Sequence, residues 1–192
     1  MYDTLKQAIN SIQLMDDSDW GIVLPMFKYR EIKKRGYLLK EGQICKNIDF
    51  IVEGCARIYA NYDGKDVTCQ FFFENGFLNE ISSFVTQTPA VFSIGAIENC
   101  KLLSISKIDI DKLYEHNMNT IKLGRKIMEQ VAIFAINRNV EINTLTAKDR
   151  YLRLIEERPK VMSRVPLHMI ASYIGITPEA LSRIRKEITT DM

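Results

Sequence analysis

Residues 30–106 consist of short runs rich in Ile, Val, Phe and Tyr that are separated by turn signals. Glycines, which readily adopt the positive φ of a tight turn, end these runs: Gly42, Gly54, Gly64 and Gly76. The Asp63-Gly64 pair between two runs indicates a hairpin. Short strands with turns at this spacing are typical of a sandwich or barrel. We therefore expect a β domain here, preceded by a helical segment over residues 1–28 that Pro25 interrupts.

After Ser106 the pattern becomes helical, with a short helix over 107–117 and a long helix without proline over 118–145. One stripe of the long helix has the alternating three- and four-residue steps of a coiled-coil seam: Ile121, Gly124, Met128, Val131, Ala135, Arg138, Ile142 and Leu145. A second apolar stripe lies on another side: Leu123, Ile127 and Phe134. Two stripes favour a helix that faces both its own β domain and a partner, and packing on its own domain alone is the alternative.

Three helix signals follow in the last 49 residues. Thr146 is positioned as the N-cap of the first helix, and Pro159 as its stop. The second helix opens at Pro166 and ends at Gly175. Thr177 caps the third helix, with Pro178 at the first helical position, where a missing N–H costs nothing. The sequence Gly-Ile-Thr-Pro is therefore expected to be a tight turn between two helices.

The spacing around this turn is that of a helix-turn-helix motif. Apolar residues are placed to seal two crossing helices: Ile170, Ile174, Ile176, Leu181 and Ile184. Ala171 is small where the helices approach each other. The outer face that remains is basic and polar, and it makes up the candidate DNA-binding set: Thr177, Pro178, Glu179, Ser182, Arg183, Arg185 and Lys186. A plain helical hairpin with a solvated charged face is the alternative.

Composition places the chain among globular, soluble proteins of one or two domains, with 192 residues, 46% of them hydrophobic and 26% charged. The longest apolar run is too short to cross a bilayer, and the first 20 residues do not resemble a signal peptide. Four cysteines without a C-x-x-C pair fit the reducing cytoplasm. From Thr144 onward nine Lys/Arg face six Asp/Glu, a net charge of +3 that indicates an anionic partner for this part.

Catalytic and metal chemistry find little support in the sequence. The two histidines, His116 and His168, both lie in helical stretches and are expected to be ordinary surface or helix-end residues. The cysteines are scattered, which disfavours an iron–sulfur cluster and favours ordinary half-buried thiols. No catalytic triad, phosphate loop or dinucleotide fingerprint is present. We expect no enzyme, no metal and no cofactor.

The order of β domain, seam helix and terminal motif resembles the catabolite-activator/fumarate-nitrate-regulator (Crp/Fnr) family of bacterial transcription factors. The segments LLKEG, FIVEGCARIY and ENGFLNE are similar to the family's cyclic-nucleotide-type jelly roll, and IASYIGITPEALSRIRK to its DNA-reading motif. The resemblance implies an α+β protein with a cyclic-nucleotide-binding-like roll over 1–117, a dimerisation helix over 118–145 and a winged-helix-like DNA-binding domain over 146–192. It places Glu179 and Arg183 where family members read base edges.

The same resemblance implies the partners. They are a second copy of the chain, palindromic double-stranded DNA and, as a further candidate, RNA polymerase. The dimer contact is expected along the seam, at Ile121, Met128, Val131, Ala135 and Ile142. The alternative function is an effector-binding or protein-interaction module whose helix-turn-helix does not read DNA.

Two departures from the family pattern matter. Relatives that bind cyclic AMP hold its phosphate with Gly-Glu and, about ten residues later, Arg-Ser, whereas this chain has Asn79-Glu80 and then Ala90-Val91. An anionic phosphate would lack its guanidinium and hydroxyl partners, and burying it unpaired is costly. The effector position, formed by Glu80, Ala90 and Val91, is therefore expected to hold an apolar ligand or a filled core, and the effector is unknown. The sequence ends at Met192, so wing contacts to DNA are not predicted.

Overall fold

The computed structural model describes residues 1–190, except for the side chains of His116, Thr189 and Thr190. Three short helical elements come first: α1 (Tyr2–Ile12), α2 (Asp17–Val23) and the 3-10 turn η1 (Leu24–Met26). Strands follow, with one short helix among them: β1 (Lys28–Ile32), β2 (Tyr37–Leu39), β3 (Asn47–Glu53), β4 (Ala56–Tyr62), β5 (Lys65–Phe72), β6 (Phe77–Leu78), α3 (Ile81–Thr86), β7 (Ser93–Ala96) and β8 (Cys100–Ser106). The rest is helical: α4 (Lys107–His116), α5 (Met118–Thr144), α6 (Ala147–Glu157), α7 (Lys160–Arg164), α8 (Leu167–Ile174) and α9 (Pro178–Thr190).

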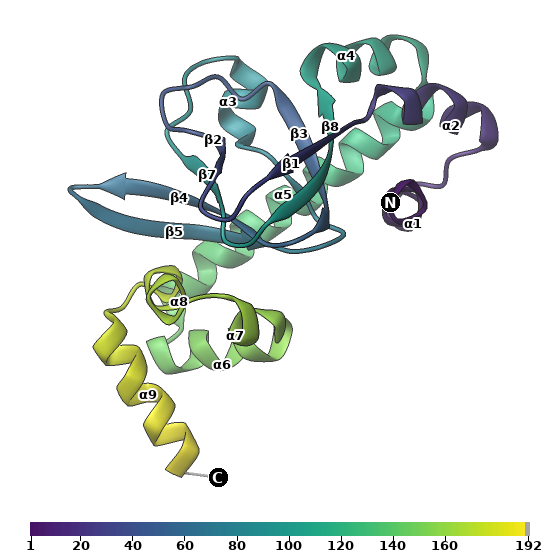
Figure 1. Cartoon of the computed structure of the whole chain (residues 1–192). Coiled ribbons are helices and arrows are strands. Elements are labelled where there is room, and N and C mark those ends of the chain that lie inside the picture. Colours follow the sequence, from purple (N-terminus) through teal and green to yellow (C-terminus); the bar gives the residue numbers. More distant parts are fainter. Residues whose placement is uncertain (191–192) are drawn as a thin grey trace.

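The strands form two antiparallel four-stranded sheets, in the orders β1-β8-β3-β6 and β2-β7-β4-β5. Facing each other, the sheets make a jelly roll (Figure 1). The hairpin expected at Asp63-Gly64 joins β4 to β5, and both residues adopt positive φ, at 52° and 74°. Two consecutive residues with positive φ match the right-handed twist of the flanking strands, which is why Asp-Gly is favoured there.

The sheet β1-β8-β3-β6 is covered on its outer side by the N-terminal helices, α4 and the first half of α5 (Figure 1). Ile48, Phe77 and Ile105 of this outer face border the same apolar crevice as side chains of the helices, among them Ile9 and Leu123. The opposite face turns inward, where Ile51 and Leu102 are fully buried. The alternation of the strand sequences therefore supplies apolar residues to two layers of packing.

Asp19 fixes the start of α5. Its carboxylate completes a capping box with Asp16 at the beginning of α2. It also accepts hydrogen bonds from the amides of Asn117 and Asn119, at 2.7 and 2.8 Å. These hydrogen bonds lower the pKa of Asp19 although burial acts in the opposite direction. The long helix is thus anchored to the N-terminal helices at the point where it leaves the roll.

The C-terminal helices agree with the sequence expectations at their caps. Thr146 accepts a hydrogen bond from the backbone N–H of Asp149 and so caps α6. Pro166 precedes α8, Gly175 ends it, and Pro178 is the first residue of α9. The short helix α7 was not predicted, because Pro159 suggested a stop. The helix α6 does end before Pro159, at Glu157, as expected. Pro159 also stands at the N-cap of α7, and proline is tolerated at that end of a helix.

None of the helices within residues 1–190 is both long and apolar enough to cross a membrane.

Candidate nucleic-acid interface

The turn between α8 and α9 is shaped by Gly175 and Thr177. Gly175 has a φ of 83°, which only glycine reaches without strain, and its N–H bonds to the carbonyls of Ala171 and Ser172. The N–H of Ala180 donates to the hydroxyl of Thr177 at 3.2 Å, so Thr177 caps α9 as expected. The two helices leave this turn at a wide angle (Figure 1).

The inner side of α9 is apolar and its outer side is polar. Leu181 is buried, and Ile184 and Ile188 pack against the same apolar cluster as Ile170 and Ile174 of α8. The candidate DNA-binding residues are all exposed: Thr177, Pro178, Glu179, Ser182, Arg183, Arg185 and Lys186. The backbone N–H at the start of α9, the Thr177 hydroxyl and Arg183 lower the pKa of Glu179. The exposed side of α9 therefore presents two carboxylates, Glu179 and Glu187, beside three cations.

The helix α8 is attached to the roll along strand β5. The Ser172 hydroxyl donates to the carbonyl of Asp66 at 2.8 Å and accepts from the N–H of Thr68 at 2.9 Å. Arg57 forms an ion pair with the Asp66 carboxylate and donates to the Thr68 hydroxyl, which stiffens the same stretch of β5. A small hydroxyl residue on α8 thus continues the hydrogen bonding of a sheet edge.

A shared apolar cluster joins the C-terminal helices to the roll. Cys55, Phe71 and Ile97 of the roll pack with buried residues of α6, α7 and α8: Tyr151, Leu154, Val161, Ile170 and Tyr173. The ring of Phe71 lies 5.3 Å from that of Tyr173. The predicted boundary at residue 146 is thus bridged by packing, while α9 points away from the roll (Figure 1).

Arg138 of α5 faces this inner packing. Its guanidinium stacks over the Tyr173 ring with 3.9 Å to the centroid and donates to the Tyr173 carbonyl. It also pairs with Glu141 at 3.4 Å. Arg138 matches the seam by its spacing, but a pair with Glu141 was the alternative expected for it, and that pair is observed. The stacking on Tyr173 could not be anticipated, because it joins residues 35 positions apart.

The predicted second apolar stripe of α5 faces the rest of the chain. Leu123 packs against the roll core, Ile127 borders the apolar crevice, and Phe134 is half-buried. Gly124, assigned to the seam, lies instead against Tyr114 of α4, where a Cβ atom would come within 2.2 Å of the phenol oxygen. The absence of a side chain at Gly124 therefore serves the contact between α4 and α5.

The remaining seam residues are exposed in the single chain. Val131 is 41% exposed and Ile142 54%, and Ile121, Met128 and Ala135 are exposed as well. A further apolar stripe that was not predicted is also exposed: Ile133, Ile136 and Val140, with Ile136 at 63%. Its three- and four-residue steps place it on one side of the helix. The helix α5 thus carries two exposed apolar stripes, the predicted seam and a second stripe on a different side of the helix.

The residues at the effector position have structural partners. The buried carboxylate of Glu80 accepts from the N–H of Ser83 at 2.7 Å and caps α3. Ala90 is buried, as expected. Val91 is 61% exposed, so the expectation that it lines a pocket is wrong. Val91 lies in the bend that precedes β7, outside the strands.

These residues do not fit a cyclic phosphate. Neither Ala90 nor Val91 offers a hydrogen-bond donor through its side chain, and the Glu80 carboxylate is occupied as a cap. The amide nitrogen of Asn79 is buried without a hydrogen-bond partner among the described residues. A single neutral donor does not replace a guanidinium and a hydroxyl.

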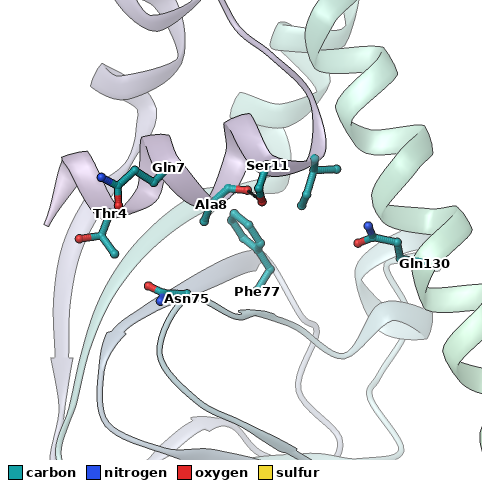
Figure 2. A pocket seen from close by; sticks show the side chains of 8 residues that line it. Thr4, Gln7, Ala8, Ser11, Asn75, Phe77 and Gln130 are labelled. Atoms are coloured by element: carbon teal, nitrogen blue, oxygen red, sulfur yellow. Dashed lines mark hydrogen bonds between the residues drawn. The ribbon is translucent and has the colours of Figure 1, made fainter. Parts of the chain in front are cut away.

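A polar groove lies between α1, β6 and α5. Figure 2 shows Thr4, Gln7 and Ser11 of α1 on one side, with Asn75, Phe77 and Gln130 around them. Its volume is about 460 Å³, and none of the residues lining it is charged. An anionic ligand would therefore find no counter-charge in this groove.

The cysteines are free, three of them buried and Cys69 half-buried. Burial raises the pKa of Cys55 to about 12 and that of Cys100 to about 11, which keeps both thiols protonated and unreactive at neutral pH.

His168 is exposed on α8, whereas the side chain of His116 lies outside the described residues.

Comparison with known proteins defines the class of the roll. Residues 29–117 match the family model of the cyclic nucleotide-binding domain. No curated protein matches the chain as a relative. Among solved structures, CLP of Xanthomonas campestris, described as a c-di-GMP-responsive global regulator, is 18% identical with a TM-score of 0.70, covering 92% of this chain and 93% of CLP.

Two further structures have the same architecture. FixK2 of Bradyrhizobium japonicum is 16% identical with a TM-score of 0.73, covering 86% of this chain and 85% of FixK2. The catabolite activator protein of Thermus thermophilus is 14% identical with a TM-score of 0.60, covering 96% of this chain and 87% of that protein. The chain thus has a cyclic nucleotide-binding-type roll followed by helices, and the resemblance to the Crp/Fnr family is confirmed.

Proposed function

We propose that the protein is a sequence-specific DNA-binding transcriptional regulator of the Crp/Fnr type. In this proposal residues 1–117 are the effector domain, residues 118–145 the dimerisation helix and residues 146–192 the DNA-binding domain. The helices α8 and α9 form the helix-turn-helix motif, and α9 enters the major groove. The alternative, a module that binds effectors or proteins but not DNA, predicts no salt-dependent binding to duplexes.

The observation that carries this proposal is the position of α9. Its apolar side packs on α8, its polar side is exposed, and the helix itself extends away from the roll (Figure 1). Arg183 stands one helical turn after Glu179, so both side chains lie on the same side of the helix. A helix with this arrangement can read base edges with Arg183 while neighbouring cations meet phosphates.

The exposed apolar face of α5 supports a homodimer. Apolar side chains that stay exposed along one helix indicate an interaction surface. Two copies related by a two-fold axis would place their α9 helices on half-sites about one DNA turn, ~34 Å, apart. A palindromic operator is therefore the expected target.

The proposal is tested by selecting binding sites from random duplexes and measuring affinity by fluorescence anisotropy at several salt concentrations. We expect palindromic sites and an affinity that falls steeply with salt. The Arg183→Ala variant should lose discrimination between the selected site and a scrambled one. The Lys33→Ala variant, which removes a charge from the β1–β2 turn, is the matched control. No enrichment and no salt-dependent binding would favour the alternative, whereas unchanged discrimination by Arg183→Ala would contradict only the role assigned to Arg183.

A further inference from the structure

The inner face of the roll contains a charged pair where an apolar core is the rule. Arg30 of β1 and Asp49 of β3 lie on the same face as the buried Ile51 and Leu102, as the strand register requires. The side chain of Asp49 is 6% exposed and that of Arg30 31%. Charged groups rarely occupy such positions unless they are paired or serve a ligand.

The pair borders a cavity that opens between the sheets. The cavity has a volume of about 460 Å³, which lies within the roughly 300–1,000 Å³ of small-molecule sites. Its apolar wall comes from β2, β7 and the loop between β2 and β3: Leu38, Leu39, Ile44 and Ile94. It adjoins the family's effector position without including it: Glu80, Ala90 and Val91 do not line the cavity, while Gln43, which does, accepts a hydrogen bond from the N–H of Ala90.

Arg30 has unused hydrogen-bonding capacity. Its nearest charged partner is Asp49 at 3.6 Å, which is too long for a hydrogen bond. Its guanidinium makes no hydrogen bond with any residue in the described part of the chain. A guanidinium offers five N–H donors in a planar fork that suits a carboxylate. Lys46 borders the same cavity and adds a second positive charge.

Asp49 limits which ligand suits Arg30. Its carboxylate accepts one hydrogen bond from Ser104, which leaves acceptor sites open toward the cavity. Burial raises the pKa of Asp49, although Ser104 and Arg30 act against this. A simple cation would be repelled by Arg30 and Lys46, and a simple anion would satisfy these cations but leave the buried carboxylate of Asp49 without a new partner. A molecule that carries both charges side by side satisfies both groups.

We propose that this cavity binds a free α-amino acid with an apolar side chain. Its carboxylate is held by Arg30, its ammonium group by Asp49, and its side chain by Leu39, Ile44 and Ile94. The inference goes beyond DNA binding and does not depend on it, because ligand binding is measured on the protein alone.

The test is isothermal titration calorimetry on the wild-type protein with L-leucine and L-phenylalanine. Two analogues of leucine each lack one charge, 4-methylpentanoate the ammonium group and 3-methylbutylamine the carboxylate. We expect binding of at least one amino acid, and about tenfold or greater weakening when either charge of leucine is missing, since a charge-assisted hydrogen bond is lost each time.

Variants test the two residues. Arg30→Gln and Asp49→Asn should each weaken amino-acid binding about tenfold or more, whereas Lys33→Gln, which removes an exposed charge outside the cavity, should leave it unchanged. No heat with either amino acid at millimolar concentration, or an analogue that binds as tightly as leucine, would overturn the proposal. If a variant fails to fold, the comparison of leucine with its two analogues on the wild-type protein still tests the proposal.

Discussion

Arg164 of α7 donates two hydrogen bonds, of 2.6 and 2.8 Å, to the carboxylate of Glu74. The two residues are 90 positions apart in the sequence. The same guanidinium bonds to Glu98, and Lys160 reaches Glu74 at 3.1 Å. Glu74 also accepts from the N–H of Gly54. These contacts tie α7 to two loops of the roll, so the position of the C-terminal helices is set by ionic as well as apolar contacts.

Arg164→Ala should destabilise the protein by about 1–2 kcal/mol, because two carboxylates lose a bidentate partner that is only 23% exposed. Chemical denaturation measures this loss. Arg125→Ala is the control: Arg125 pairs with Glu129 on the surface of α5, where ion pairs contribute little. Equal losses in the two variants would contradict a specific role for Arg164.

The ion pair of Glu74 with Arg164 should make the stability of the protein depend on pH. Hydrogen bonds from Arg164, with smaller contributions from Lys160 and Gly54, lower the pKa of Glu74 from 4.5 to about 2. A carboxyl group whose pKa is lower in the folded than in the unfolded state stabilises the protein. This stabilisation is complete at pH values above the pKa of the unfolded state, and it is lost as the pH falls to the pKa of the folded state. Thermal melts of wild type and Glu74→Gln should therefore differ at neutral pH and converge between pH 4.5 and about 2. A constant difference across that range would argue against the lowered pKa.

Arg183 and Arg185 should contribute to DNA binding in different ways. A bidentate contact from Arg183 to guanine provides about 1–3 kcal/mol of discrimination, whereas Arg185 contributes to affinity and salt dependence through phosphate. Anisotropy titrations on a selected site and a scrambled site separate the two effects. If Arg183→Ala keeps full discrimination while Arg185→Ala loses it, the roles are reversed.

Val131→Glu should convert the dimer into a monomer and abolish palindrome binding, since two like charges would face each other across the seam. Sedimentation velocity measures the oligomeric state. Gln130→Glu adds the same charge at a neighbouring exposed position and should remain a dimer. Ile136→Glu tests the second exposed stripe. A monomer with Ile136→Glu but not with Val131→Glu would move the contact to that stripe.

Cyclic AMP and cyclic GMP should change neither the melting temperature nor the DNA affinity at millimolar concentration. Losing a bidentate arginine and a hydroxyl removes charge-assisted hydrogen bonds worth ~1.5–3 kcal/mol each, which weakens binding by several decades. Calorimetry with either nucleotide checks this. A clear isotherm in the micromolar range would show that another cation replaces the missing arginine.

The local structure could be predicted from the order of the residues alone. Glycines and Asp63-Gly64 marked the turns of the roll, because positive φ is restricted to few residue types. Thr146, Thr177 and Gly175 marked helix ends, because caps act on backbone groups a few residues away. Periodicity is also a local signal, and it indicated a sandwich or barrel and the two apolar stripes of α5. The cyclic-nucleotide type of the roll came from the resemblance of its segments to a known family.

Contacts between residues far apart in the chain could not be predicted in this way. Arg164 with Glu74, Ser172 with Asp66 and Arg30 with Asp49 belong to segments whose proximity depends on how the sheets and helices pack. Arg138 and Gly124 fitted a seam by spacing but face inward, toward Tyr173 and Tyr114. Val91 turned outward for a similar reason. Sequence spacing specifies positions along one element, whereas the side of that element that is covered depends on its neighbours in the fold.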